Sequence, residues 1–361
     1  MSTAILTASV KKVLAEALSL KSIPDNWVQV LESKEGDYTI TLTLPFPHDK
    51  SHRLWQDQIL DDLSKNNTIQ IHSLKWQWQS QIVAQEVPSQ VKTIPQVKNI
   101  IAIASGKGGV GKSTMTTHLA LALAAEGARV GILDADIYGP NQPNLLGITE
   151  KPQLQGKALI PMLKYDVQSM SIGYLLDSTE TPVIWRGPMV SGALQQLLYD
   201  TLWHDLDYLL IDMPPGTGDI QLTLAQKIPV SGAVIVTTPQ DLALLDVQKA
   251  VNMFKKVAIP LLGVVENMAY YHCPQCGHPD AIFGEAGGQR MAEQFNIDLL
   301  GAVPLNTDIR RASDAGVPLV IAEPESAITQ VYQQIALKMA ARLALNITQV
   351  KRRFAKIVVE K

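Results

Sequence analysis

The clearest pattern along the chain is a set of short apolar runs that alternate with segments of helical spacing from about residue 99 onward. Continuous apolar runs of this length are typical of strands buried on both faces of a parallel sheet. Because helix-like segments separate them, the pattern predicts a doubly wound, mostly parallel α/β sheet with its site at the carboxyl ends of the strands. The runs are residues 99–104, 130–133, 209–211, 233–236 and 261–265.

The first part of the chain has a different pattern. Residues 10–20 have helical spacing, while 27–31 and 38–44 alternate between apolar and polar residues as strands do. A second helix is expected at 51–65 and a third strand within 69–83, before a polar stretch that contains two prolines. The domains expected are a small α+β domain at 1–86, a linker at 87–97, an α/β P-loop domain at 98–345 and a basic tail at 346–361.

Composition and charge narrow the class of protein. Of 361 residues, 46% are hydrophobic and 18% charged, which suits a globular chain of about two domains. The net charge of −3 gives no support for a nucleic-acid-binding surface. We find neither an apolar run of membrane-spanning length nor a signal-peptide pattern. The two cysteines are too few for a disulfide framework, so we expect a cytoplasmic protein without nucleic-acid or membrane partners.

The glycine-rich stretch at 106–114 carries the most specific chemistry. It follows the apolar run at 99–104 and precedes a helix-like segment, an order that gathers backbone N–H groups around a phosphate. The pattern G-x-x-x-x-G-K-[ST] is met in full and predicts a nucleoside triphosphatase that binds ATP and Mg²⁺. The residues expected to bind nucleotide are Gly106, Gly108, Gly109, Val110, Gly111, Lys112, Ser113 and Thr114.

The same glycines also satisfy G-x-G-x-x-G, the dinucleotide fingerprint, with Asp134 near the distance expected of a ribose-binding acid. Two features favour the triphosphatase. Lys112 and Ser113 directly follow the last glycine, where a cation would neutralise the β/γ-phosphates and a hydroxyl would hold Mg²⁺. A second acidic strand end, Asp212, suits a carboxylate that reaches the metal directly or through water.

Three further charged residues have plausible tasks at this site. Asp134 and Asp136 close the strand at 130–133, where a carboxylate can orient the attacking water or the metal's water shell. The alternative for Asp134 is a capping or turn residue. Lys107 follows the first glycine, and its long side chain could reach a phosphate bound in a facing subunit. The alternative for Lys107 is a solvated lysine.

Cys273 and Cys276 lie two residues apart in a stretch rich in turn residues. A [4Fe–4S] cluster is usually held by four thiolates, so two chains related by a two-fold axis would have to supply them. Zinc competes, either with four cysteines across a dimer or with His272 or His278 as additional ligands. A thioredoxin-like redox pair uses the same spacing, but there the first cysteine opens a helix. The spacing alone leaves zinc and iron–sulfur open.

Residues 106–114 together with 134–136 resemble the deviant Walker A ATPases, which dimerise face to face around nucleotide. Four further motifs resemble the Mrp/ApbC family of iron–sulfur cluster carriers, and the N-terminal unit is similar to a SufT-like domain, though without the cysteine that such domains sometimes carry. These motifs are residues 185–189, 212–219, 266–268 and 273–277.

The resemblance implies a role for each candidate residue. Lys107 would act across the dimer, Asp136 would position the hydrolytic water and Asn267 would contact adenine. Ser113 and Asp212 would serve Mg²⁺, and Cys273 and Cys276 would carry the cluster.

Two classes of function follow. The first is an ATP-dependent homodimeric carrier that delivers [4Fe–4S] clusters to apo-proteins, with scaffold proteins as further partners. The second is a nucleotide-switched P-loop ATPase in a regulatory or positioning role, with a structural zinc knuckle.

Overall fold

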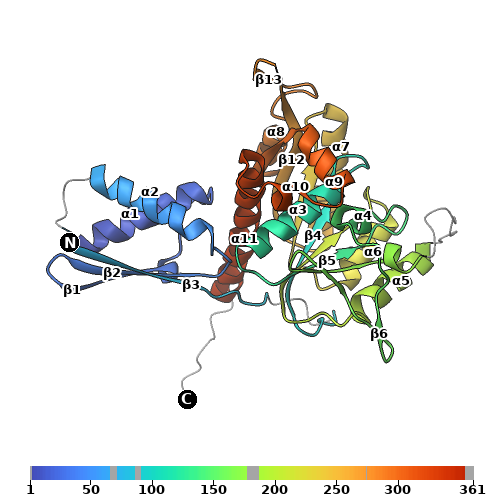
Figure 1. Ribbon diagram of the computed structural model, residues 1–361, viewed down its shortest axis with the longest axis horizontal. Coiled ribbons are helices and arrows are strands. Elements are labelled where there is room, and N and C mark those ends of the chain that lie inside the picture. The colour runs from blue at the N-terminus through green and yellow to red at the C-terminus, as the bar shows by residue number, and fades with distance from the viewer. Residues whose placement is uncertain (1, 66–70, 86–90, 177–186, 274, 354–361) are drawn as a thin grey trace.

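The computed structural model describes residues 2–65, 71–85, 91–176, 187–273 and 275–353. A small N-terminal unit lies beside a larger body, and the last helix of the chain lies between them (Figure 1). Of the ranges named above, residues 1, 66–70, 86–90, 177–186, 274 and 354–361 lie outside the described part.

The N-terminal unit is a three-stranded sheet with two helices on one face (Figure 1). β1 and β2 pair antiparallel, and α2 carries the chain to β3, which pairs parallel to β2. Along β2, Tyr38, Ile40, Leu42 and Leu44 are buried against the helices because side chains alternate between the two faces of a strand. The elements are α1 (Ser2–Ala17), β1 (Val28–Lys34), β2 (Asp37–Leu44), α2 (Ser51–Lys65) and β3 (Ser73–Ser80).

The body is built on one large sheet. Its strands lie in the order β14-β12-β11-β4-β10-β5-β9 and pair in parallel, with the short antiparallel strands β8 and β13 added to β9 and β12. The predicted doubly wound, mostly parallel sheet is therefore confirmed. The strands are β4 (Val97–Ala104), β5 (Val130–Asp134), β8 (Met162–Lys164), β9 (Val167–Ser171), β10 (Leu206–Asp212), β11 (Gly232–Thr237), β12 (Leu261–His272), β13 (Pro279–Asp280) and β14 (Leu299–Leu305), beside a separate hairpin of β6 (Leu154–Gln155) and β7 (Ala158–Leu159).

Helices cover both faces of this sheet. α3 connects β4 to β5, and α7 connects β11 to β12. These two connections lead towards opposite edges of the sheet, so right-handed crossovers place α3 and α7 on opposite faces. α11 packs beside α3, and α8 packs beside α7. The helices are α3 (Lys112–Ala125), α4 (Gln142–Leu146), α5 (Gly187–Tyr199), α6 (Asp219–Lys227), α7 (Asp241–Lys256), α8 (Gly287–Phe295), α9 (Thr307–Asp314), α10 (Leu319–Ala322) and α11 (Ala327–Arg353).

The N-terminal unit is attached to the body at the far end of α3. Glu126, which follows the last residue of α3 and is 1% exposed, accepts hydrogen bonds from the backbone N–H groups of Lys50 and Ser51, both at 3.0 Å. The Ser51 hydroxyl adds a third at 2.6 Å. These donors lie at the first turn of α2, so a carboxylate of the body caps a helix of the N-terminal unit.

Some element boundaries differ from the sequence-based expectation. α1 begins at Ser2 and ends at Ala17, not at 10–20, because Leu6 already belongs to its buried face and Ser19 adopts a left-handed conformation. β3 covers Ser73–Ser80 of the described residues 71–83, and α11 continues past residue 345 to Arg353. No helix in the described residues is both long and apolar enough to cross a membrane.

Candidate functional site

The glycine-rich loop lies between β4 and α3 at the carboxyl end of the sheet, as predicted. Gly111 caps α3 with a φ of 81°, and a Cβ at this position would lie 2.3 Å from Nδ2 of Asn267. A Cβ at Gly106 would lie 2.4 Å from the backbone of Asp246 in α7. Both positions therefore require glycine. Gly111 needs it for its backbone conformation and for space, and Gly106 needs it for space alone.

Lys112 and Asp212 meet directly beneath this loop. The Nζ of Lys112 is paired with Oδ1 of Asp212, and both side chains are almost fully buried. Thr116, one turn further along α3, donates to the same carboxylate oxygen at 3.3 Å. The hydroxyl of Ser113 lies 3.5 Å from the Lys112 ammonium. The structure thus brings together the lysine, the hydroxyl and the strand-end acid that the sequence singled out.

Gln142 completes this group and was missed by the sequence analysis. Its Nε2 donates to Oδ2 of Asp212 at 2.9 Å and to the backbone oxygen of Ser113 at 3.1 Å, while its Oε1 accepts from Thr117 at 2.7 Å. Gln142 is fully buried at the start of α4. No motif in the sequence marks this glutamine, because its position depends on the path of the loop after β5.

The two carboxylates after β5 have different surroundings. Asp134 is fully buried, accepts from the backbone N–H groups of Asp136 and Gln142 at 3.1 Å each, and receives the Ser171 hydroxyl at 3.1 Å. Burial, followed by the charge of Asp212, raises the pKa of Asp134 to about 8. Asp134 therefore stabilises the loop that follows β5. This agrees with the alternative that it is a turn residue.

Asp136 instead lines the cavity and lies 4.0 Å from Nζ of Lys112. Burial is the main cause that raises the pKa of its carboxyl group. Of the two acids, Asp136 is the one within reach of a ligand.

Lys107 lies at the rim of the same cavity. Its Nζ donates to Oε1 of Gln240 at 3.0 Å, an oxygen that also accepts from the Thr238 hydroxyl at 3.0 Å. The side chain is half-buried and extends away from the Lys112–Asp212 pair toward the start of α7. Within one chain, Lys107 therefore contacts a neutral amide. Among the described residues, it forms no ion pair with a carboxylate.

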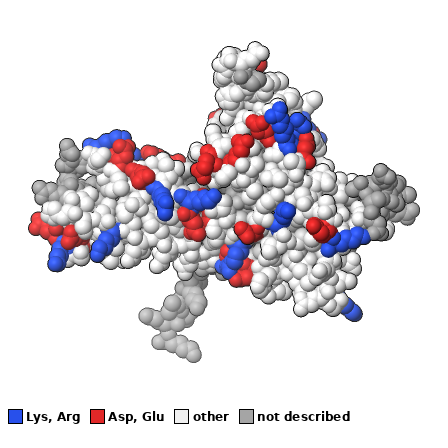
Figure 2. All heavy atoms as spheres, in the orientation of Figure 1, with Lys and Arg blue, Asp and Glu red and all other residues white. Residues whose placement is uncertain are grey.

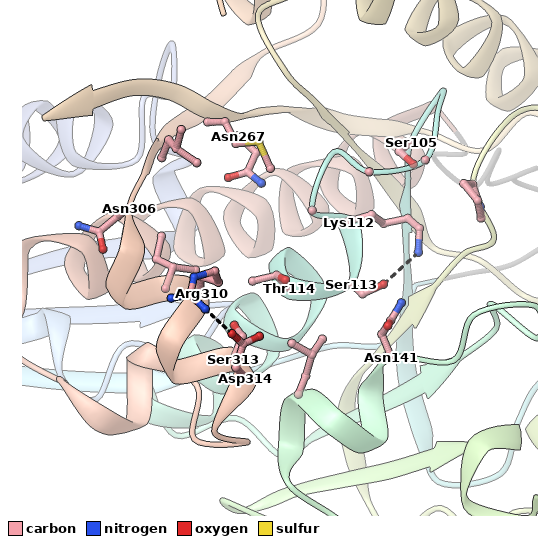
Figure 3. Close-up of a pocket in the computed structure, with 18 of the residues that line it drawn as sticks. Ser105, Lys112, Ser113, Thr114, Asn141, Asn267, Asn306, Arg310, Ser313 and Asp314 are labelled. Atoms are coloured by element: carbon pink, nitrogen blue, oxygen red, sulfur yellow. Dashed lines mark hydrogen bonds and ion pairs between the residues drawn. The ribbon is translucent and has the colours of Figure 1, made fainter. Parts of the chain in front are cut away.

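The cavity at the glycine-rich loop has a volume of about 700 Å³. Asn267, on β12, lines its upper side and donates to the backbone oxygen of Val110 at 2.8 Å. The opposite wall is α9, where Arg310 forms an ion pair with Asp314 at 2.6 Å (Figure 3). This wall was not predicted, because α9 carries no motif that would mark it as facing the glycine-rich loop.

Cys273 and Cys276 lie well away from this cavity, on the hairpin that joins β12 to β13. The hairpin projects from the body and shows few charged atoms (Figure 2). The backbone of Cys273 accepts from Gly277 at 2.8 Å and donates to His278 at 3.0 Å, which forms a tight turn. Backbone N–H groups of Cys276 and Gln275 lower the pKa of the Cys273 thiol.

The hairpin offers two thiols but no complete metal site in one chain. Cys276 is exposed and Cys273 half-exposed, so both are accessible. Within the described residues, no three His, Cys, Asp or Glu side chains lie close enough together to hold a metal ion. In the described part of the chain, neither His272 nor His278 joins the two cysteines in such a group.

Comparison with known proteins agrees with this geometry. Residues 96–340 match the family described as ParA, NUBPL iron-transfer P-loop NTPase. The iron-sulfur cluster carrier protein of Pseudomonas fragi is 57% identical over 259 residues, which cover 71% of this chain and 90% of that protein. The protein of the same name from Haemophilus influenzae is 47% identical over 320 residues, covering 88% of this chain and 86% of its own.

A solved structure extends the comparison to the fold. The nucleotide-binding protein of Archaeoglobus fulgidus, in complex with ADP and with cobalt, has a TM-score of 0.57 and 40% identity. The match covers 64% of this chain and 90% of that chain.

Proposed function

Since the chain belongs to the NUBPL iron-transfer P-loop NTPase family, we propose that it is an ATP-dependent carrier of iron–sulfur clusters. The observation that supports this most is the presence of two separate sites on one sheet. The cavity at the glycine-rich loop lies at the carboxyl end of β4, and two accessible thiols lie on the hairpin after β12. An energy-dependent carrier needs both, one for the triphosphate and one for the cargo.

The nucleotide would bind along the cavity with its phosphates at the glycine-rich loop. The backbone N–H groups of 106–114 and the ammonium of Lys112 would hold the β- and γ-phosphates. The phosphate oxygens would then compete with Asp212 for Lys112. Asn267 lies on the cavity wall beyond the loop, where it would contact the adenine.

A magnesium ion fits the donor set beside Lys112. The Ser113 hydroxyl and the Asp212 carboxylate are oxygen ligands of the kind that Mg²⁺ prefers, and Gln142 holds Asp212 in place. When bound, Mg²⁺ would neutralise the charge on the phosphates. Asp136 lines the cavity and lies 4.0 Å from the Lys112 ammonium, too far for a hydrogen bond, so its carboxylate would be available to orient the attacking water.

We also propose that the active form is a homodimer. Two chains would supply the four thiolates that a [4Fe–4S] cluster usually takes. Beside the glycine-rich loop, Leu242 and Leu245 of α7 are 75% and 60% exposed, and a facing subunit would cover them. Lys107, held by a neutral amide within its own chain, would then reach the nucleotide of its partner.

The cluster is the cargo, and apo iron–sulfur proteins would receive it. Metal analysis of protein purified without oxygen tests this function. About four irons and four sulfides per dimer are expected, with loss of both in a Cys273→Ser variant that retains ATP binding. Stoichiometric zinc without iron would overturn the carrier function and would favour the zinc-knuckle ATPase.

A further inference from the structure

His118 is a fully buried residue of α3, less than two turns from Lys112. Its Nδ1 lies 2.8 Å from the backbone oxygen of Thr114, so this nitrogen carries the proton and donates. Its Nε2 lies 3.2 Å from the backbone nitrogen of Leu319 and accepts from that N–H group. The ring is therefore neutral, and both of its nitrogens are satisfied.

The contact with Leu319 fixes the wall of the cavity that faces the glycine-rich loop. Leu319 is the first residue of α10, so its N–H group has no partner within that helix. Only four residues separate it from Asp314, the end of α9, and Arg310, Ser313 and Asp314 of α9 all line the cavity. His118, on α3, thus accepts the hydrogen bond from the N–H group at the end of the connection between α9 and α10.

The third contact of His118 joins α11 to the same point. Its ring stacks on Tyr332, with centroids 4.4 Å apart and planes inclined by 25°. Tyr332 is 1% exposed and lines the cavity from α11. Thr114, bonded to Nδ1, lines it from α3. One side chain therefore contacts α3, α11 and the first residue of α10, the helix that follows the α9 wall.

We propose that His118 is a positioning residue that sets the distance between the glycine-rich loop and the α9 wall, so that triphosphate and nucleoside are bound together. The inference rests on the proposed function, because it takes the cavity to be the ATP site. His118 does not touch the ligand and acts through Leu319 and Tyr332. Its loss should weaken the binding of the nucleoside portion and leave the phosphate portion unaffected.

The test compares ADP with inorganic tripolyphosphate as probes. In the full-length His118→Phe protein the ring and the stack on Tyr332 are retained, but the N–H group of Leu319 loses its acceptor. We expect the Kd for ADP to rise about ten-fold, because a buried donor is left unsatisfied, while the Kd for tripolyphosphate changes less than about two-fold. The KM for ATP should rise more than kcat falls. His118→Gln, whose amide offers a donor and an acceptor, should recover part of the affinity for ADP.

Leu198→Ala serves as the control for general loss of stability, since Leu198 is fully buried in α5 and does not line the cavity. It should lower the melting temperature without changing either Kd. If both His118 variants bind ADP as the wild type does, or lose ADP and tripolyphosphate by the same factor, the positioning role is wrong while ATP binding stands. A wild-type protein that binds tripolyphosphate but not ADP or ATP would overturn the proposed function and this inference together.

Discussion

The attachment of the N-terminal unit to the body depends on Glu126, and its replacement by Ala should loosen that attachment. The carboxylate accepts three hydrogen bonds, from the N–H groups of Lys50 and Ser51 and from the Ser51 hydroxyl, in a place where it is 1% exposed. Hydrogen bonds to a charged group contribute about 1.5–3 kcal/mol each, and loss of a helix cap costs about 0.5–2 kcal/mol.

Water can reach the first turn of α2 once the contact opens, so the three contributions will not add in full. We expect Glu126→Ala to destabilise the N-terminal unit by about 3 kcal/mol and Glu126→Gln by about 1 kcal/mol, since a neutral amide oxygen can still accept.

Tryptophan fluorescence during urea unfolding measures this effect. Four of the six tryptophans, Trp27, Trp55, Trp76 and Trp78, lie in the N-terminal unit. With a urea dependence of about 2 kcal/mol per molar, the fluorescence midpoint should fall by roughly 1.5 M in Glu126→Ala.

The matched control is Glu293→Ala, because Glu293 is exposed on α8 and its carboxylate accepts a hydrogen bond from Gln289 of the same helix. It should change stability by less than about 0.5 kcal/mol. An unchanged midpoint for Glu126→Ala, or the same shift in both variants, would refute the capping argument.

Three further predictions concern the cavity. Lys107→Ala should lower kcat for ATP by roughly 10³-fold while the Kd for ATP changes little. The control Lys157→Ala, at an exposed lysine, should leave both values unchanged. Normal turnover in Lys107→Ala would exclude the action of this lysine across subunits. Gln142→Ala removes the 2.9 Å hydrogen bond to Asp212 and should slow hydrolysis by about ten- to a hundred-fold. A magnesium titration of the initial rate should show a higher Mg²⁺ requirement. An unchanged titration would contradict the role of Gln142 in holding Asp212. Burial lowers the pKa of His118 from about 6.5 to about 4, so between these pH values the unfolded chain binds a proton that the native chain does not. The free energy of unfolding should therefore fall with decreasing pH in this window, by up to about 3 kcal/mol more in the wild type than in His118→Phe. Parallel pH profiles of urea unfolding for the two proteins would refute this.

The parts of the molecule that local pattern determines could be read from the sequence. The apolar runs at 209–211 and 233–236 became β10 and β11 because a parallel strand buried on both faces needs no polar residue. The glycine-rich loop was predictable down to Gly111, whose conformation and close contact with Asn267 admit no side chain. Asp212 followed from its position at the end of a strand.

The parts that depend on how distant segments meet could not be read in this way. Gln142 reaches Asp212 only because the loop after β5 folds back around Asp134. The α9 wall and the contact of His118 with Leu319 join residues about two hundred positions apart. A buried histidine in an apolar helix carries no local signal of such a partner.

The long strand β12 carries both Asn267, at the cavity, and the hairpin with Cys273. Beyond Tyr271, its last pair with β14, the strand continues only into the hairpin with β13, so a protein bound at the tip would cover the thiols without reaching the cavity. If the chain delivers clusters as proposed, substitutions at the tip would alter the choice of recipient while hydrolysis at the cavity stays intact.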